Sequence, residues 1–201
     1  MRPKRNTYTL AALNLTGYAS NVTGGTWTLT STTGPNDGMG HLVSIRNDSA
    51  TDHSAKTVVL TGTDTQGRAL TETINAPGTS ATVYSTRYFK TLLTAVPSAT
   101  IGADTMDIGW GEACATPFYP VNAYAIQGPN VGVDVGGTIA YTTQMTNDDP
   151  FNVNPMKWTD VGTSSTTVDS LLALVSATTA VRVIVASHTA GTLAISYSQG
   201  K

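Results

Sequence analysis

Clusters of turn-forming residues recur along this chain, and strong helical periodicity is absent from the stretches between them. The clusters include residues 24–25, 34–38, 76–78, 128–130 and 147–150. The stretches between turns are rich in Thr, Val, Ile, Leu and Tyr, at the spacing of roughly 8–12 residues that is typical of β-sandwiches and barrels. Thr occurs 36 times and Glu only twice, whereas exposed helix faces normally carry many Glu and Lys. This pattern predicts an all-β protein.

The turn Asp64-Thr65-Gln66-Gly67 gives the most detailed structural prediction. Asp at its first position and Gly at the position that needs a left-handed backbone favour a three-residue loop with a bulge. Closed in this way, the turn pairs Asp64 with Arg68 and joins two strands, residues 57–63 and 68–74. The predicted register pairs Val58 with Ile74, Leu60 with Glu72 and Gly62 with Leu70, which leaves Val59, Thr61, Thr63, Ala69, Thr71 and Thr73 on the opposite face.

The C-terminal segment has a similar pattern. Residues 181–187 and 192–197 flank His188-Thr189-Ala190-Gly191, so that His188 and Gly191 take the places of Asp64 and Gly67. The sequence therefore predicts a second hairpin. Its expected inner face carries Val183, Val185, Leu193, Ile195 and Tyr197.

Residues 109–120 are irregular, with two prolines and two glycines, and indicate a boundary. We predict an N-terminal arm at residues 1–7, a β domain at 8–110, a linker or crossover at 111–120 and a second β domain at 121–201. Each domain is expected to be a small antiparallel β-sandwich of jelly-roll or immunoglobulin-like type. One continuous sandwich is the alternative. Residues 170–177 form the one candidate helix.

The charges are few and their distribution is informative. The formal net charge is −2, so no overall field favours binding to nucleic acid. Arg2, Lys4 and Arg5 make an extended basic arm that could interact with an acidic neighbour. No apolar run of signal-peptide length follows, and no stretch approaches the ~20 apolar residues of a membrane span. We expect a protein made in a cytoplasm, without a membrane partner.

The residue types that carry catalysis or bind metals do not form a recognisable motif. His41, His53, His188 and Cys114 lack the spacing of metal ligands, so we predict no metal, no cofactor and no catalytic residue. His53 and His188 are expected on the solvated surface, and Cys114 is expected to be a small buried apolar residue.

Three further groups have a structural and a functional interpretation. Glu72 is one of only two Glu, with Glu112, and we expect it to pair with Arg87 or to lie at the open edge of a sheet rather than to catalyse. The oxygen-rich residues 36–38 and 147–149 fit turns better than Ca²⁺ sites. The three tryptophans are expected in the core, with a sugar-stacking surface as the alternative; they are Trp27, Trp110 and Trp158.

Part of the sequence resembles a known group of proteins. The run VVLTGTDTQGRALTETI at residues 58–74 is followed by VYSTRYFKT at 83–91 and ATIG at 99–102. Together these resemble a pattern found in uncharacterised virion proteins of tailed bacteriophages and prophages, over about residues 42–111. The resemblance implies a component of the virus particle and identifies no catalytic residues.

The expected function is therefore that of a non-enzymatic capsid decoration (cement) protein, which stabilises the head through subunit contacts. Threonine-rich, charge-poor faces can pack against other subunits with little desolvation of charge. The expected partners are the major capsid protein or other virion proteins and further copies of this chain, with a trimer favoured. The expected location is the virion, after synthesis in the host bacterial cytoplasm. Alternatives are a tail-associated or head–tail connector component, and a receptor- or glycan-binding β module.

Overall fold

The computed structural model describes residues 4–122, 128–164, 168–174 and 178–199. Within these residues every regular element is a β-strand and the strand pairs are antiparallel, so the all-β prediction is confirmed. No helix in this part of the chain is long and apolar enough to cross a membrane. The chain divides into two compact units. The middle unit is Ala12–Cys114, and the terminal unit combines Met1–Ala11 with Ala115–Lys201.

The limits of these units differ from the predicted domain boundaries at both ends. Residues 4–7, predicted as part of an N-terminal arm, belong to strand β1 (Lys4–Thr9), which pairs with the last strand, β13. The residues predicted as a linker, 111–120, belong largely to two strands. The first of them form the end of β8 (Met106–Ala115), and the last two form the short β9 (Tyr119–Pro120). Gly111 lies in β8, where a side chain would collide with the Tyr84 ring, because a Cβ would be 2.9 Å from it.

The middle unit consists of two antiparallel sheets. The first has the order β2-β8-β3-β6 and the second the order β5-β4-β7. The chain passes from the first sheet to the second at Lys90, between β6 and β7, and residues 26–32 form no strand. The strands are β2 (Asn14–Val22), β3 (Gly40–Asn47), β4 (Thr57–Thr63), β5 (Ala69–Asn75), β6 (Thr82–Phe89) and β7 (Thr91–Pro97).

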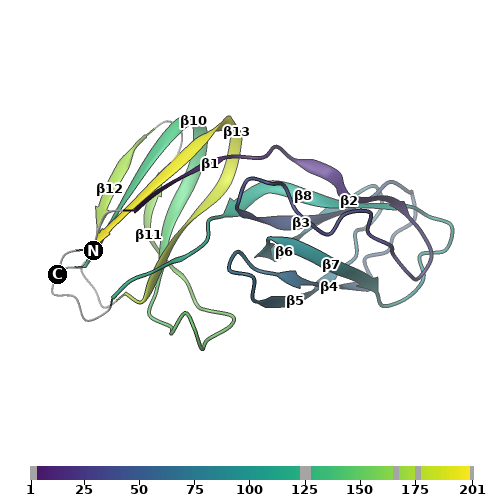
Figure 1. Cartoon of the computed structure of the whole chain (residues 1–201). Helices are drawn as coiled ribbons and strands as arrows, with labels where there is room; N and C mark the ends of the chain where they lie inside the picture. Colours follow the sequence, from purple (N-terminus) through teal and green to yellow (C-terminus); the bar gives the residue numbers. More distant parts are fainter. Residues whose placement is uncertain (1–3, 123–127, 165–167, 175–177, 200–201) are drawn as a thin grey trace. The chain divides into compact units, whose positions relative to one another are not determined.

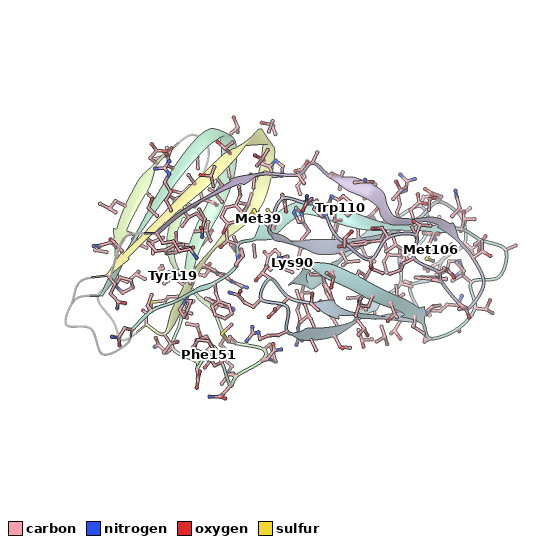
Figure 2. The ribbon with its side chains drawn as sticks, viewed as in Figure 1. Met39, Lys90, Met106, Trp110, Tyr119 and Phe151 are labelled. Atoms are coloured by element: carbon pink, nitrogen blue, oxygen red, sulfur yellow. The ribbon has the colours of Figure 1, made fainter. Side chains whose placement is uncertain are left out.

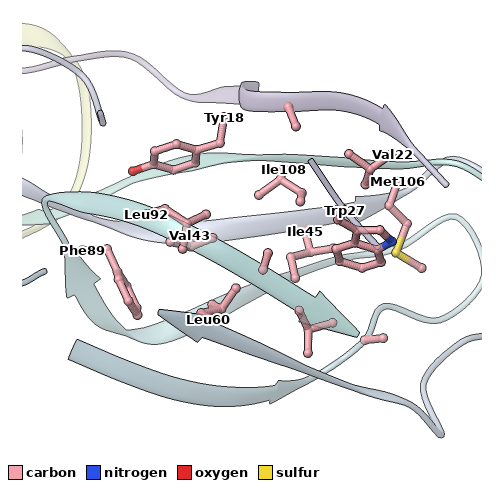
Figure 3. Close-up of a cluster of buried hydrophobic side chains, with 14 of the residues drawn as sticks. Tyr18, Val22, Trp27, Val43, Ile45, Leu60, Phe89, Leu92, Met106 and Ile108 are labelled. Atoms are coloured by element: carbon pink, nitrogen blue, oxygen red, sulfur yellow. The ribbon is translucent and has the colours of Figure 1, made fainter. Parts of the chain in front are cut away.

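Both sheets of the middle unit contribute to one apolar core (Figure 3). Ile45 and Ile108 come from the first sheet, and Leu60 and Leu92 from the second; all four are fully buried. Trp27, from the segment between β2 and β3, closes the core beside Met106. Burial of such side chains contributes about 1.5–3 kcal/mol each. This core includes the predicted inner face of the first hairpin, with Val58, Leu60 and Leu70 buried and Ile74 partly buried.

The predicted hairpin at residues 57–74 is confirmed in register and turn, with the second strand one residue later than predicted, at Ala69–Asn75. Val58 pairs with Ile74, Leu60 with Glu72 and Gly62 with Leu70. The turn closes through two backbone bonds, from Asp64 N–H to the Arg68 carbonyl and from Gly67 N–H to the Asp64 carbonyl. Gly67 has φ 79°, the left-handed conformation that the sequence predicted.

The terminal unit is built around two long paired strands, β10 (Pro129–Thr146) and β13 (Ala180–Gln199) (Figure 1). β11 (Thr159–Ser164) and β12 (Ser170–Ala173) pair with β10, while β1 and β9 pair with β13. The helix predicted at residues 170–177 is wrong for residues 170–173, since these form β12. Pairing with Asn130–Val133 outweighs the weak helical preference of so short a segment. Residues 175–177 lie outside the described residues.

The predicted C-terminal hairpin is wrong, because β13 continues through residues 188–191 as one strand. Its partner β10 is almost as long, so cross-strand pairing is available along the whole length. Two bulges occur in β13: one residue is added between Val185 and Ser187, and another between His188 and Gly191. Two additions restore the original alternation. The predicted inner face is therefore still correct: Val183, Val185, Leu193, Ile195 and Tyr197 are all buried.

The bulges also bend the strand pair, so that its two halves enclose the core of the terminal unit (Figure 1). Tyr141, in the second half of β10, donates a hydrogen bond of 2.7 Å to Ser170 Oγ. Ser170 belongs to β12, which pairs with the first half of β10 at Val133. This bond therefore links the two halves across the interior. The buried residues between them include Val131, Val133, Ile139, Val181, Val183 and Ile195.

Candidate functional site

The turn residues singled out from the sequence have a structural role. Asp64 Oδ1 accepts hydrogen bonds from the backbone N–H of Gln66 (2.8 Å) and Arg68 (3.0 Å). Its other oxygen, Oδ2, accepts one from Arg68 Nε at 2.7 Å. The side chains of Asp64 and Arg68, together with the left-handed backbone of Gly67, therefore stabilise the turn.

The basic N-terminal residues are part of the terminal unit itself. Arg5 forms an ion pair with Asp134 at 2.5 Å, between side chains that are both about half exposed. The Lys4 ammonium lies 6.0 Å from the centre of the Tyr119 ring. Exposed pairs of this kind add about 0–1 kcal/mol to stability. Arg2, the third residue of the predicted interaction arm, lies outside the described residues.

His41 is fully buried and both of its ring nitrogens are engaged. Nδ1 lies 3.0 Å from the Gly111 carbonyl and Nε2 lies 2.8 Å from Asp37 Oδ2. A carbonyl only accepts, so Nδ1 carries the hydrogen there. The arrangement crosslinks the interior and leaves no ring nitrogen to activate a nucleophile.

His53 was predicted to be solvated, and this is wrong because it is 2% exposed. Its Nε2 lies 3.0 Å from Asp104 Oδ2, and the Lys56 ammonium lies 2.7 Å from its Nδ1. Hydrogen bonds from Thr51, His53 and Ser49 lower the pKa of Asp104, with Thr51 the largest cause. Asp104 thus accepts hydrogen bonds from the loop that carries His53, whose side chain the local sequence pattern predicted to be exposed to solvent.

His188 was also predicted at a solvated hairpin tip, and it too is buried, at 6% exposure. The reason is the continuous path of β13, in which His188 pairs with the buried Ile139. Neither ring nitrogen has a hydrogen-bond partner within the described residues. Gly191, the other predicted turn residue, is a strand position opposite Gly137.

Cys114 is fully buried, as the sequence predicted. Burial, and secondarily the negative charge of Asp37, raises the pKa of its thiol. The Cys114 sulfur lies 3.8 Å from the Met39 sulfur. The thiolate that a nucleophile or metal ligand requires is therefore disfavoured at this position.

Glu72 joins the two sheets of the middle unit. Its Oε1 accepts hydrogen bonds from the N–H and Oγ1 of Thr86, and its Oε2 accepts one from the Arg87 N–H at 3.0 Å. The sequence predicted that Glu72 would pair with Arg87 or lie at a sheet edge. Glu72 lies on the edge strand β5 and accepts a hydrogen bond from the backbone amide of Arg87. With both oxygens committed to β6, Glu72 serves as a structural link.

The oxygen-rich turns use their carboxylates locally. Asp37 binds the Met39 N–H and His41, while Asp148 and Asp149 accept backbone N–H groups of their own loop. Among the residues that the structure describes, no group of three or more His, Cys, Asp or Glu is placed to hold a metal ion.

The tryptophans pack against other groups. Trp27 is buried, and Trp110 meets the Tyr18 ring edge-on with centroids 5.3 Å apart while donating to the Ala12 carbonyl. Trp158 is partly buried, with the Arg182 guanidinium 4.3 Å from its ring centre and Phe118 at 6.3 Å. All three rings thus have packing partners within the chain.

The outer side of the β5-β4-β7 sheet is the surface with the most regular chemistry. Three rows cross it, and every position in them is Thr, Val or Ala; we call this surface the threonine face. Thr63 and Thr91 within it are joined by a hydrogen bond of 2.7 Å between their hydroxyls. The rows are Thr73–Val59–Val96, Thr71–Thr61–Thr94 and Ala69–Thr63–Thr91.

The sequence predicted the six positions of this face that lie on β4 and β5, but not the three that lie on β7. The hairpin register placed the β4 and β5 residues together, but nothing local showed that β7 pairs with the other edge of β4. In addition, β7 has a bulge: Thr61 pairs with Thr94 and Gly62 with Leu92, so Leu93 is an added residue. Leu93 and Val96 are each 51% exposed and make the β7 side of the face apolar.

Comparisons with protein-family models, with curated proteins and with solved structures found no match to this chain.

Proposed function

We propose that this chain is a non-enzymatic structural protein of a tailed-bacteriophage virion, and specifically a capsid decoration protein that attaches through the threonine face. The observation that carries the proposal is the absence of any charged residue from the nine positions of that face. The sequence resemblance to virion proteins, which includes the same strands, supports the same proposal.

An uncharged β surface suits attachment to another folded protein. Docking removes water from both surfaces, and burying an unpaired charge is far more costly than burying a hydroxyl that finds a partner. Threonine provides a methyl group for packing and a hydroxyl for hydrogen bonds, while its branched side chain is already restricted. Leu93 and Val96 add apolar area at one side of the face.

The size of the face favours several attachments at once. Three strands about 4.8 Å apart, with rows about 6.8 Å apart, cover only about 300 Å². A stable protein interface buries about 800 Å² on each partner. One threonine face alone would therefore bind weakly, and a homo-oligomer that presents several faces to a capsid would gain from multivalency. We favour a trimer.

The proposal includes the detailed fold class. The two sheets of the middle unit share one core, and the bent strand pair of the terminal unit encloses another. Both arrangements support a β-sandwich in each unit, with the middle unit inserted in sequence between the two chain segments of the terminal unit rather than following it in tandem. Jelly-roll and immunoglobulin-like types are the versions that we propose.

The test is co-sedimentation of the purified chain with emptied heads of a phage whose genome encodes it. Thr71→Lys places a charge in the middle row of the threonine face, at an exposed position on the edge strand β5, and Thr189→Lys makes the same change at an exposed position of β13 as a control. Wild type and Thr189→Lys should sediment with heads, and Thr71→Lys should bind at least roughly tenfold more weakly. A wild-type chain that stays in the supernatant, or Thr71→Lys that binds normally, overturns the proposal. Sedimentation with purified tails alone would favour the tail-associated alternative.

A further inference from the structure

Two large apolar side chains of the terminal unit are exposed to water. Phe151 is 76% exposed and Leu171 is 79% exposed, the two largest fractions among the described large apolar residues. With so much of each surface accessible, neither side chain covers the other within one copy. Exposed aromatic residues held in a fixed position are frequent anchors of protein interfaces.

The loop that carries Phe151 is held in a defined conformation. We call residues 147–158, between β10 and β11, the Phe151 loop (Figure 2). Asp149 Oδ1 accepts the Phe151 N–H at 2.9 Å, and Asp148 Oδ2 accepts the Lys157 N–H at 2.6 Å. The hydroxyl of Thr179 also binds the Asp148 carbonyl. These bonds fix the backbone on both sides of Phe151, so little conformational entropy remains to be lost on binding.

Leu171 lies beside a strand position that has no side chain, Gly132. It pairs with Gly132 of β10, and a Cβ at Gly132 would be 3.8 Å from Leu171 Cδ1 and 3.7 Å from Ser196 Cβ. The flanking Val131 and Val133 are buried, so Gly132 and Leu171 belong to the outer side of the sheet. Aromatic rings that cover glycine in a strand are favourable, because they shield backbone that has no side chain of its own.

Each region also carries one exposed charged side chain of opposite sign to the other, while the loop's own Asp148 and Asp149 carboxylates bind N–H groups of the loop. Lys157 is an exposed residue of the Phe151 loop, and Asp169 is an exposed residue two positions from Leu171. Asp169 is oriented by accepting the Val135 N–H at 2.9 Å. Contact between the two regions would therefore bring a cation towards a fixed carboxylate.

We propose that the Phe151 loop of one copy packs on Gly132 and Leu171 of a second copy, with Lys157 directed at Asp169. The contact joins two different surfaces and is therefore heterologous, so repeating it generates a closed ring or an open filament. The inference goes beyond the proposed function by naming the contact between copies, and it does not require a capsid.

The test is the solution mass of the full chain by light scattering over a concentration series, with three variants. Phe151→Ser and Leu171→Ser should each raise the dissociation constant of the oligomer on the order of tenfold or more. Leu13→Ser, at another exposed leucine, is the matched control and should assemble as wild type. A monomeric wild-type chain, or normal assembly of Phe151→Ser and Leu171→Ser, overturns the inference.

Mixing the two variants tests whether the contact is heterologous. Phe151→Ser keeps an intact Leu171 surface, and Leu171→Ser keeps an intact Phe151 loop, so an equimolar mixture should form heterodimers and nothing larger. Homodimers of Leu171→Ser alone would instead indicate contact between two Phe151 loops and contradict the inference. Since these measurements contain no heads, their failure is separate from a failure of the threonine face to bind a capsid.

Discussion

Gly137 and Gly191 face one another across the pairing of β10 and β13, at the edge of a bulge. Their φ angles are 134° and 151°, which side-chain-bearing residues rarely adopt. A Cβ on Gly137 would lie 2.3 Å from the Ala190 carbonyl oxygen, and one on Gly191 would lie 2.3 Å from that of Gly136. Each glycine thus permits the close approach of the other strand where the pair bends.

We expect Gly137→Ala and Gly191→Ala each to lower the free energy of unfolding by about 2 kcal/mol or more, from backbone strain and from the contact with the facing carbonyl. Gly132→Ala in the same strand is the control, because its new Cβ would meet atoms no closer than 3.7 Å. Urea denaturation of the three variants measures the difference. Equal stability of Gly137→Ala and Gly132→Ala would contradict this account of the bend.

The two hairpin predictions show what local sequence can specify. Residues 57–74 carry a complete closing signal, in which Asp64 caps its own turn and Gly67 adopts the left-handed backbone. At residues 188–191 the first position is His, which cannot accept these backbone bonds as a carboxylate does. The alternation of Val183 to Tyr197 was nevertheless read correctly, because two bulges preserve the parity of a continuous strand.

The candidate sites depend on pairings between distant parts of the chain, which local patterns do not reveal. The threonine face is completed by β7, whose register with β4 includes the Leu93 bulge. The conformation of the loop that exposes Phe151 includes hydrogen bonds to the carboxylates of Asp148 and Asp149. The sequence indicated these two residues only as turn formers. Burial of His53 depends on Asp104, 51 residues away.

The carboxylate of Asp64 should be worth about 2 kcal/mol to the middle unit. Asp64→Ala removes the acceptor of two backbone N–H groups and of Arg68 Nε, and each hydrogen bond contributes about 0.5–1.5 kcal/mol. Asp64→Asn retains an oxygen for the backbone bonds and loses mainly the ion pair, so it should cost less than about 1 kcal/mol. Thermal unfolding compares them. If both variants are equally destabilised, the ion pair and not the turn is the main contribution.

Removal of the Asp37 carboxylate should be among the most destabilising changes in the middle unit. Its side chain is 4% exposed and its partner His41 is fully buried, so Asp37→Ala leaves a buried polar group without its partner, at a cost of about 3–5 kcal/mol. Asp48→Ala, which removes a partner of Arg46 whose side chain is 38% exposed, should cost less than about 1 kcal/mol. A similar loss in both variants by urea denaturation would show that the buried pair contributes no more than a surface one.

The conformation of the Phe151 loop should depend on pH through Asp149. Hydrogen bonds, first from the Phe151 N–H and then from Asn152, lower the pKa of the Asp149 carboxyl below its ordinary value of 3.8. A lowered folded pKa means that the stabilisation is complete above the unfolded pKa and is lost as the pH falls through the folded value. The amide proton shift of Phe151, followed by NMR, should therefore titrate with a midpoint below 3.8. Asp149→Asn should abolish this titration, and a midpoint at or above the ordinary value would show that the carboxylate does not hold the loop.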